Sequence, residues 1–289
     1  MAQVVMINGR LVPANEAVVS VFDRGFLYGD SVFETLRTYG GVPFRSALHW
    51  ERLRASAERV FIELPVAPDT IDQEVRAAVL AAQNSESYVR VVVTRGTGDT
   101  LGLDPALANQ PTRVILVGPL MAPAAAAYAE GVSVISYRTS RVADDTEASG
   151  AKVGNYLVAV LAMREAKKHG ALEALIVDGS GRVLEGATSN IFMVNAGGLL
   201  TPPLELGILP GITRRTVLEL AESLGIPREE QALRLTDLLQ ADEVFITSSI
   251  REILPVVRID GNPIKAGQPG SITQKLLKEF RRFALETNC

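Results

Sequence analysis

The chain has 289 residues, 47% of them hydrophobic, and a formal net charge of −4 at pH 7. This length allows two domains of ordinary size, and interspersed charges of both signs exclude a broad basic surface for nucleic acid. One cysteine and two histidines exclude an internal disulfide and a Cys/His metal cluster. A carboxylate-only metal site stays open, but no aspartate-rich loop resembles one, so we expect no metal site.

The N-terminus has no basic segment followed by a long apolar one, so it does not resemble a signal peptide. The uncharged run at residues 114–129 contains two prolines and is shorter than the roughly 20 residues of a membrane-spanning helix. We therefore expect a cytoplasmic protein that has neither a membrane nor a nucleic-acid partner.

Hydrophobic periodicity and turn residues predict strands and helices from the first part of the chain onward. The expected elements there are strands at 4–7 and 10–12 joined by an Asn8-Gly9 turn, two strands within 31–44 around Gly40-Gly41, helices at 47–60 and 70–82, and strands at 88–96 and 113–120. Asp69 is the expected N-cap of the helix at 70–82.

The second part of the chain also mixes strands and helices. Its expected elements are a strand at 132–137, a polar loop at 138–150, a helix within 150–170, a hairpin at 174–194, helices at 213–224 and 236–239 (the latter capped by Thr236), a strand at 242–249 and a helix at 272–283. The order lacks a regular βαβ repeat, which favours the α+β class. We expect a domain at 1–117, a Pro/Ala-rich linker at 118–130 and a larger domain at 131–289.

Lys152 stands at the front of the helix expected within 150–170. A helix N-terminus disfavours a cation by ~0.3–1 kcal/mol, whereas Lys167, Lys168 and His169 lie at the favourable end before Gly170. A positive field and partial burial would both lower the pKa of this lysine, which makes a neutral, nucleophilic amine easier to obtain. The alternative is an ordinary solvated lysine.

Four other features are candidates for chemistry. Glu185 lies in a hairpin strand among apolar and small residues, where its carboxylate either faces solvent or is buried and needs a cationic or N–H partner. The Pro210-Gly211 turn precedes a helix whose first amides can bind phosphate, or are simply those of a surface helix. Two serines that end the strand at 242–249, and Arg52 on a helix, could contribute further anion contacts.

An amine, a carboxylate and a phosphate site together suit pyridoxal 5′-phosphate, which bonds to a lysine, keeps its ring nitrogen protonated and is anchored through its phosphate. The runs KVGNYL, LEGATSNIF, GILPGITRR and ADEVFITSS, within residues 7–283, resemble the fold-type IV pyridoxal-phosphate enzymes. That family includes branched-chain aminotransferases, D-amino-acid aminotransferases and aminodeoxychorismate lyases. The resemblance implies a small N-terminal α/β domain and a larger C-terminal domain with a barrel-like mixed sheet.

The resemblance also implies a role for each matching residue. Lys152 matches the catalytic lysine that forms the Schiff base, and Glu185 matches the partner of the pyridine nitrogen. The other implied cofactor contacts are Arg52, Tyr156, Leu209, Ile212, Thr213, Ser248 and Ser249. Tyr156 departs from the pattern, because the usual spacing from lysine to tyrosine is one residue longer.

Among family members, the chain most resembles the branched-chain enzyme. The implied substrate residues are Tyr28, Phe33, Thr35, Tyr88, Arg90 and Ile250. They imply transamination of L-leucine, L-isoleucine or L-valine with 2-oxoglutarate, the side-chain carboxylate of glutamate pairing with Arg90. The family builds its active site at a subunit interface, which implies a homodimer or a higher homo-oligomer.

Two features bear on the alternatives. Residues 100–102 read Thr-Leu-Gly, where D-amino-acid aminotransferases typically carry an Arg-x-His carboxylate trap. Thr35 stands where many branched-chain enzymes have glycine and the lyase has a threonine nearby, which leaves a 4-amino-4-deoxychorismate lyase open. A D-amino-acid or (R)-amine transaminase also stays an alternative, because changes of a few pocket residues separate these activities. A cofactor-binding protein without catalysis and a non-enzymatic α+β domain also stay open.

Overall fold

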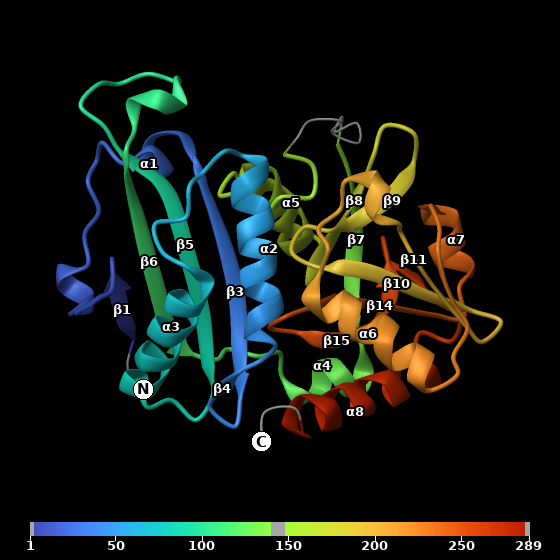
Figure 1. Ribbon diagram of the computed structural model, residues 1–289. Helices are drawn as coiled ribbons and strands as arrows, with labels where there is room; N and C mark the ends of the chain where they lie inside the picture. The colour runs from blue at the N-terminus through green and yellow to red at the C-terminus, as the bar shows by residue number, and fades with distance from the viewer. Residues whose placement is uncertain (1–2, 140–147, 287–289) are drawn as a thin grey trace. The chain divides into compact units, whose positions relative to one another are not determined.

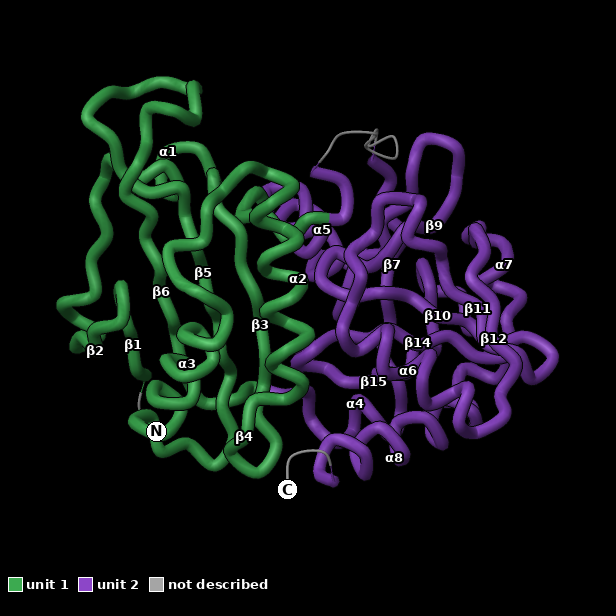
Figure 2. The backbone as a smooth tube through the Cα atoms, viewed as in Figure 1, with its two compact units in different colours: residues 1–121, 151–155, 287–289 green, residues 122–150, 156–286 purple. Residues whose placement is uncertain are grey.

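The computed structural model describes residues 3–139 and 148–286, and these form two compact units (Figure 2). Unit 1 holds the chain up to residue 121 and also residues 151–155, while unit 2 holds residues 122–150 and 156–286. The expected linker at 118–130 includes the end of one strand and a short helix. Part of the polar loop expected at 138–150, and Cys289, lie outside the described residues.

Unit 1 is a sheet covered by helices, and its strands and hairpins match the expected ones (Figure 1). Its elements are β1 (Val4–Ile7), β2 (Arg10–Val12), α1 (Arg24–Tyr28), β3 (Ser31–Tyr39), β4 (Val42–Pro43), α2 (Ser46–Arg59), α3 (Pro68–Ala82), β5 (Ser87–Thr97) and β6 (Gln110–Pro119), with short 3₁₀ turns at Ala14–Glu16 and Pro105–Leu107. The strands lie in the order β2-β1-β6-β5-β3-β4.

Alternation along β3 and β5 gives this sheet two different faces, because successive side chains of a strand point to opposite sides. Val32 and Leu36 of β3 and Val89 and Val91 of β5 are fully buried in the core, which they share with Leu53 and other residues of α2 and α3. Thr35 pairs with Arg90 in the antiparallel register. The opposite face therefore carries Thr35 and Arg90.

Unit 2 is built on a larger mixed sheet. Its elements are α4 (Ala125–Glu130), β7 (Val132–Arg138), α5 (Leu157–Lys168), β8 (Glu173–Val177), β9 (Arg182–Gly186), β10 (Asn190–Asn195), β11 (Gly198–Thr201), a 3₁₀ turn (Leu204–Leu206), α6 (Ile212–Ser223), β12 (Arg228–Glu230), β13 (Leu233–Arg234), α7 (Leu235–Gln240), β14 (Glu243–Ser248), β15 (Glu252–Ile259), β16 (Asn262–Pro263) and α8 (Ser271–Glu286). The order is β12-β11-β10-β14-β15-β7-β8-β9-β13, with β16 beside β15, and the sheet curls into a half-barrel. This confirms the α+β class.

The helices differ from expectation at three N-termini. Helix α3 begins at Pro68 with Ala67 as its N-cap, so the prediction of an Asp69 cap was wrong. Proline is well placed at the first helical position, and it starts the helix two residues earlier than an Asp69 cap would. Helix α7 begins at Leu235, which puts Thr236 inside the helix rather than at its cap.

The third difference concerns α5, which begins only at Leu157. Its buried face consists of Ala162 and Ala166, whereas Leu157 and Val160 are 65% and 58% exposed. The apolar side chains that indicated a helix therefore do not fill the core of this chain. Among the described residues, no helix combines the length and the apolar character needed to cross a membrane.

Candidate functional site

Lys152 lies in an extended segment and not at a helix N-terminus, which corrects the expectation. Val153 forms an antiparallel bridge with Val32 at the edge of β3. The backbone carbonyl of Lys152 accepts from the Phe33 amide at 3.0 Å, and its own amide donates to Ser56 Oγ of α2 at 3.0 Å. The lysine backbone is thus fixed from both sides by unit 1.

The side chain of Lys152 meets one predicted substrate residue within unit 1. Its Nζ lies 4.6 Å from the centroid of the Phe33 ring, and the guanidinium carbon of Arg90 lies 3.9 Å from the same centroid. The pleat puts Thr35 and Tyr88 on this face as well, since Arg37 pairs with Tyr88 in the register. An amine, an aromatic wall and a guanidinium are therefore brought together here. Tyr28, at the end of α1, is 41% exposed.

On the other face of β3, Arg52 forms a buried ion pair that the sequence did not predict. Its Nε and Nη2 each donate to Glu34 at 2.7 Å, and His49 Nδ1 lies 2.7 Å from the same carboxylate. Burial alone would raise the pKa of fully buried Glu34, but Arg52 holds that pKa well below its usual range. Burial lowers the pKa of His49, against the opposing effect of the Glu34 carboxylate.

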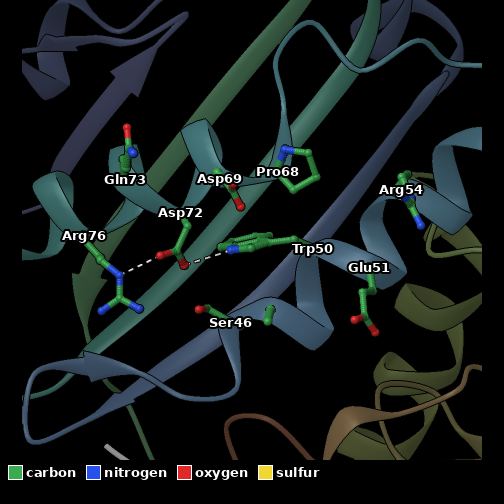
Figure 3. A pocket seen from close by; sticks show the side chains of 10 residues that line it. Ser46, Trp50, Glu51, Arg54, Pro68, Asp69, Asp72, Gln73 and Arg76 are labelled. Atoms are coloured by element: carbon green, nitrogen blue, oxygen red, sulfur yellow. Dashed lines mark hydrogen bonds and ion pairs between the residues drawn. The ribbon is translucent and has the colours of Figure 1, made fainter.

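Unit 1 also has an open hollow of about 700 Å³ between α2 and α3 (Figure 3). Trp50 crosses it and donates from Nε1 to Asp72 at 2.9 Å, while Arg76 donates to the other oxygen of Asp72 at 2.6 Å. None of the predicted site residues lines this hollow. The Trp50–Asp72 bond joins the two helices, whereas the Arg76–Asp72 pair lies within α3.

In unit 2, Glu185 is positioned by backbone as well as by side-chain contacts. Its Oε2 accepts from the Leu209 amide at 3.1 Å and lies 3.4 Å from Asn190 Nδ2. Asn190 also donates to the Leu209 carbonyl at 2.9 Å, which joins β9, β10 and the loop before α6. Asn190 is a site residue that sequence reasoning missed, although it lies within the LEGATSNIF run that carried the resemblance.

The loop before α6 approaches Asn190 so closely that only glycine fits. A Cβ added at Gly211 would lie 2.0 Å from Asn190 Oδ1. Gly211 is the N-cap of α6 and supplies no side-chain cap for the first amides of that helix, where the buried residues Ile212 and Thr213 stand. Glu185, Leu209 and the N-terminus of α6 are therefore held together inside unit 2.

The two serines predicted at the end of β14 lie close to the start of β10, the strand that begins with Asn190. Thr247 pairs with Asn190 in the β10–β14 register, which puts their side chains on one face of the sheet. Thr247 Oγ1 is buried and has no hydrogen-bond partner among the described residues. Ser248 ends the strand, and Ser249 and Ile250 follow in the turn. An unsatisfied hydroxyl and uncapped amides suit an anionic ligand such as a phosphate.

Tyr156 is the N-cap residue of α5 in unit 2, whereas Lys152 belongs to unit 1.

The residues that sequence reasoning missed are Glu34 and Asn190, each of which holds a predicted site residue. Glu34 stands between Val32 and Leu36 on the core face of β3, and Asn190 begins the strand β10; a polar side chain at such a position is the signal that could have identified them. Among the described residues, no group of three or more His, Cys, Asp or Glu side chains could hold a metal ion.

Comparison with known proteins gives a consistent result. The family described as amino-transferase class IV matches residues 31–259. A protein of Methanocaldococcus jannaschii, provisionally named a branched-chain-amino-acid aminotransferase, is 42% identical over 96% of this chain and 95% of its own length. A D-alanine aminotransferase of Bacillus licheniformis is 34% identical over 94% of each chain.

Solved structures agree in fold. The branched-chain amino acid aminotransferase of Escherichia coli superposes with a TM-score of 0.93 at 32% identity, covering 100% of this chain and 97% of its own. The branched-chain amino acid aminotransferase of Thermoproteus uzoniensis, solved with norvaline, gives a TM-score of 0.89 at 34% identity, covering 98% and 95%. Another branched-chain amino acid aminotransferase, solved with pyridoxamine 5′-phosphate, gives a TM-score of 0.92 at 31% identity, covering 98% and 94%.

Proposed function

Because this chain belongs to the class IV aminotransferases and is a pyridoxal-phosphate-dependent transaminase, we propose that it exchanges amino groups between L-branched-chain amino acids and 2-oxoglutarate. The observation that carries the substrate proposal is the face of β3 and β5 in unit 1. There the Phe33 ring offers an apolar wall for leucine, isoleucine or valine, and Arg90 beside it offers a cation for the second carboxylate of glutamate.

Lys152 is the proposed catalytic residue. When bound, pyridoxal phosphate supplies an aldehyde that bonds to an amine and a protonated ring that withdraws electrons from the substrate. With the cofactor bound, the Lys152 amine would take the proton from the substrate Cα as a general base and would give it back as a general acid. The two backbone hydrogen bonds of Lys152 keep this amine in a fixed place during both transfers.

Glu185 is the proposed partner of the cofactor's ring nitrogen. A carboxylate at that nitrogen keeps it protonated, and the Leu209 amide and Asn190 hold Glu185 in place. Arg52, the first amides of α6 and Ser249 are the proposed phosphate contacts, Leu209 packs on the ring, and Tyr156 bonds its phenolic oxygen. These assignments follow the family resemblance residue by residue.

We also propose that the protein is a homodimer or a larger assembly of dimers. The exposed apolar side chains of α5 supply one surface for a second copy. Phe22 and Phe26, 56% and 67% exposed near α1, supply another. Light scattering after size-exclusion chromatography tests this, and a monomer at micromolar concentration would contradict it.

The decisive experiment for the substrate is a visible spectrum of the purified protein before and after addition of L-leucine. We expect the yellow absorbance of the bound cofactor to fall with L-leucine and with L-glutamate, and to stay unchanged with D-alanine. The same additions to a Lys152→Ala variant serve as the control, and this variant should not turn over any donor.

A response to D-alanine and none to L-leucine would replace the proposal with a D-amino-acid transaminase, which similarity to D-alanine aminotransferases makes the second candidate. If neither L-leucine nor D-alanine changes the absorbance, (R)-amines and 4-amino-4-deoxychorismate are the substrates to test next.

A further inference from the structure

The turn that joins β14 to β15 in unit 2 ends in a strained residue. Glu252, the first residue of β15, has φ +58°, in the left-handed region that residues with a Cβ rarely adopt. Such a conformation persists only where the surroundings fix it, and it is found preferentially at functional sites. Here it closely follows Ser249 and Ile250, two residues of the proposed ligand-binding turn.

Arg251, the residue before Glu252, is held at its backbone and at its side chain. Its amide donates to Ser248 Oγ at 3.3 Å, which closes the turn, and its carbonyl accepts from the Tyr128 hydroxyl at 3.2 Å. The Nη1 of its guanidinium donates to the Glu173 carboxylate and, at 2.9 Å, to Thr188 Oγ1. The Arg251 side chain is 18% exposed, whereas that of Glu173 is fully buried.

The strained residue has its own partner on α8. Arg281 donates from Nε to the Glu252 carboxylate at 2.8 Å, and its guanidinium carbon lies 4.6 Å from the centroid of the Tyr128 ring. Tyr128 therefore contacts Arg281 through its ring and Arg251 through its hydroxyl. These contacts fix both residues that end the turn.

Glu173 connects the turn to the strand of Glu185. It accepts from Thr188 Oγ1 at 2.9 Å and lies 3.3 Å from Ser189 Oγ, and both residues stand in the loop that follows Glu185 and Gly186. The Gly186 amide donates to the Ser189 carbonyl at 2.7 Å, which closes this loop. One buried carboxylate thus bonds the turn after β14 and the loop after β9.

We propose that Arg251 is a positioning residue that, through Glu173, fixes the distance between the turn at 248–250 and Glu185. The inference rests on the proposed function, in which Ser249 contacts the cofactor phosphate and Glu185 its ring nitrogen. A rigid ligand with an anion at one end and a ring nitrogen at the other binds well only if both contacts stay correctly spaced. The Arg251–Glu173 pair meets that requirement without touching the ligand.

The test compares two ligands that differ only in the phosphate. The full-length protein is freed of cofactor, and its dissociation constants for pyridoxal 5′-phosphate and for pyridoxal are measured by absorbance titration. The variant is the double substitution Arg251→Met with Glu173→Gln, which removes the ion pair without leaving a buried charge unpaired. The matched control is Arg258→Met, an exposed arginine of β15 whose Nη1 donates to the Gly261 carbonyl at 3.4 Å.

We expect the double variant to bind pyridoxal 5′-phosphate at least tenfold more weakly and pyridoxal within twofold of the parent, and Arg258→Met to change neither. Arg251→Lys should recover part of the difference, because it keeps the positive charge beside Glu173 but lacks the planar guanidinium whose Nη1 donates to both Glu173 and Thr188. An unchanged preference for the phosphorylated ligand in the double variant would overturn the inference. Equal weakening of both ligands would overturn it too, since it would show a general structural role.

The outcome also separates this inference from the function on which it rests. If the parent protein itself shows no preference for pyridoxal 5′-phosphate over pyridoxal, the proposed phosphate site is wrong. If the parent shows the preference and the double variant retains it, the site stands and only the role of Arg251 fails.

Discussion

Replacement of Glu34 by glutamine should destabilise unit 1 strongly, although it changes one atom. Both Glu34 oxygens accept from donors at 2.7 Å, two on Arg52 and one on His49, and the side chain is fully buried. A glutamine amide would turn its own N–H groups toward one of these donors. The charge of Arg52 would then stay buried without its anion, which costs about 3–5 kcal/mol.

The assay is urea unfolding of Glu34→Gln, followed by circular dichroism. Glu58→Gln is the matched control, because Glu58 forms an exposed pair with Arg54 at 3.6 Å that is worth at most about 1 kcal/mol. The double variant Glu34→Gln with Arg52→Met should recover part of the loss, since it leaves no unpaired charge. If the free energy of unfolding of Glu34→Gln lies within about 1 kcal/mol of the parent's, the reasoning that Glu34 and Arg52 form a coupled buried ion pair is refuted.

Two further predictions test the second unit. Burial alone would raise the pKa of Asp178, but hydrogen bonds from Ser180 and Arg182 lower it from 3.8 to about 2. The stability that Asp178 contributes is therefore fully present above pH 3.8 and is lost as the pH falls toward 2. The urea midpoint of Asp178→Asn should accordingly fall less than that of the parent over this pH range. Gly211→Ala should lower the free energy of unfolding by about 1–3 kcal/mol, because the added methyl group displaces Asn190, and it should weaken cofactor binding. Gly179→Ala, with open space around it, should do neither when both variants are compared by urea unfolding and by cofactor titration.

The strands of unit 1 and its two longer helices could be predicted because their signals are local. In unit 2 the strands β11 and β15 and the short strands β12, β13 and β16 were not predicted. Alternation along β3 and β5 and the Asn8-Gly9 turn are properties of a few adjacent residues. The prediction for Lys152 failed because its segment pairs with β3, which lies more than a hundred residues earlier. A short extended segment next to a helix has no local signal that distinguishes it from the first turn of that helix.

The residues of the candidate site also divide into those that have a local signal in the sequence and those that have none. Lys152 and Glu185 could be singled out because charged residues among small or apolar neighbours are unusual in sequence. The partners that hold predicted site residues could not be assigned, since the bond from Glu34 to Arg52 joins a strand to a helix and the bonds of Asn190 join three segments. Such pairs are set by packing, which a single sequence does not display.

The placement of residues 151–155 also has a consequence for how this protein can be cut and recombined. The chain leaves unit 1 after residue 121, returns for five residues and leaves again. A gene fragment that ends at residue 121 would encode a unit without its lysine, and the edge of β3 at Val32 would lose its bridge to Val153. Exchange of whole domains between relatives by a single crossover at residue 121 would therefore pair the lysine of one parent with the β3 of another. Chimeras that keep both together and take all of unit 2 from the other parent need three junctions, at 121/122, 150/151 and 155/156.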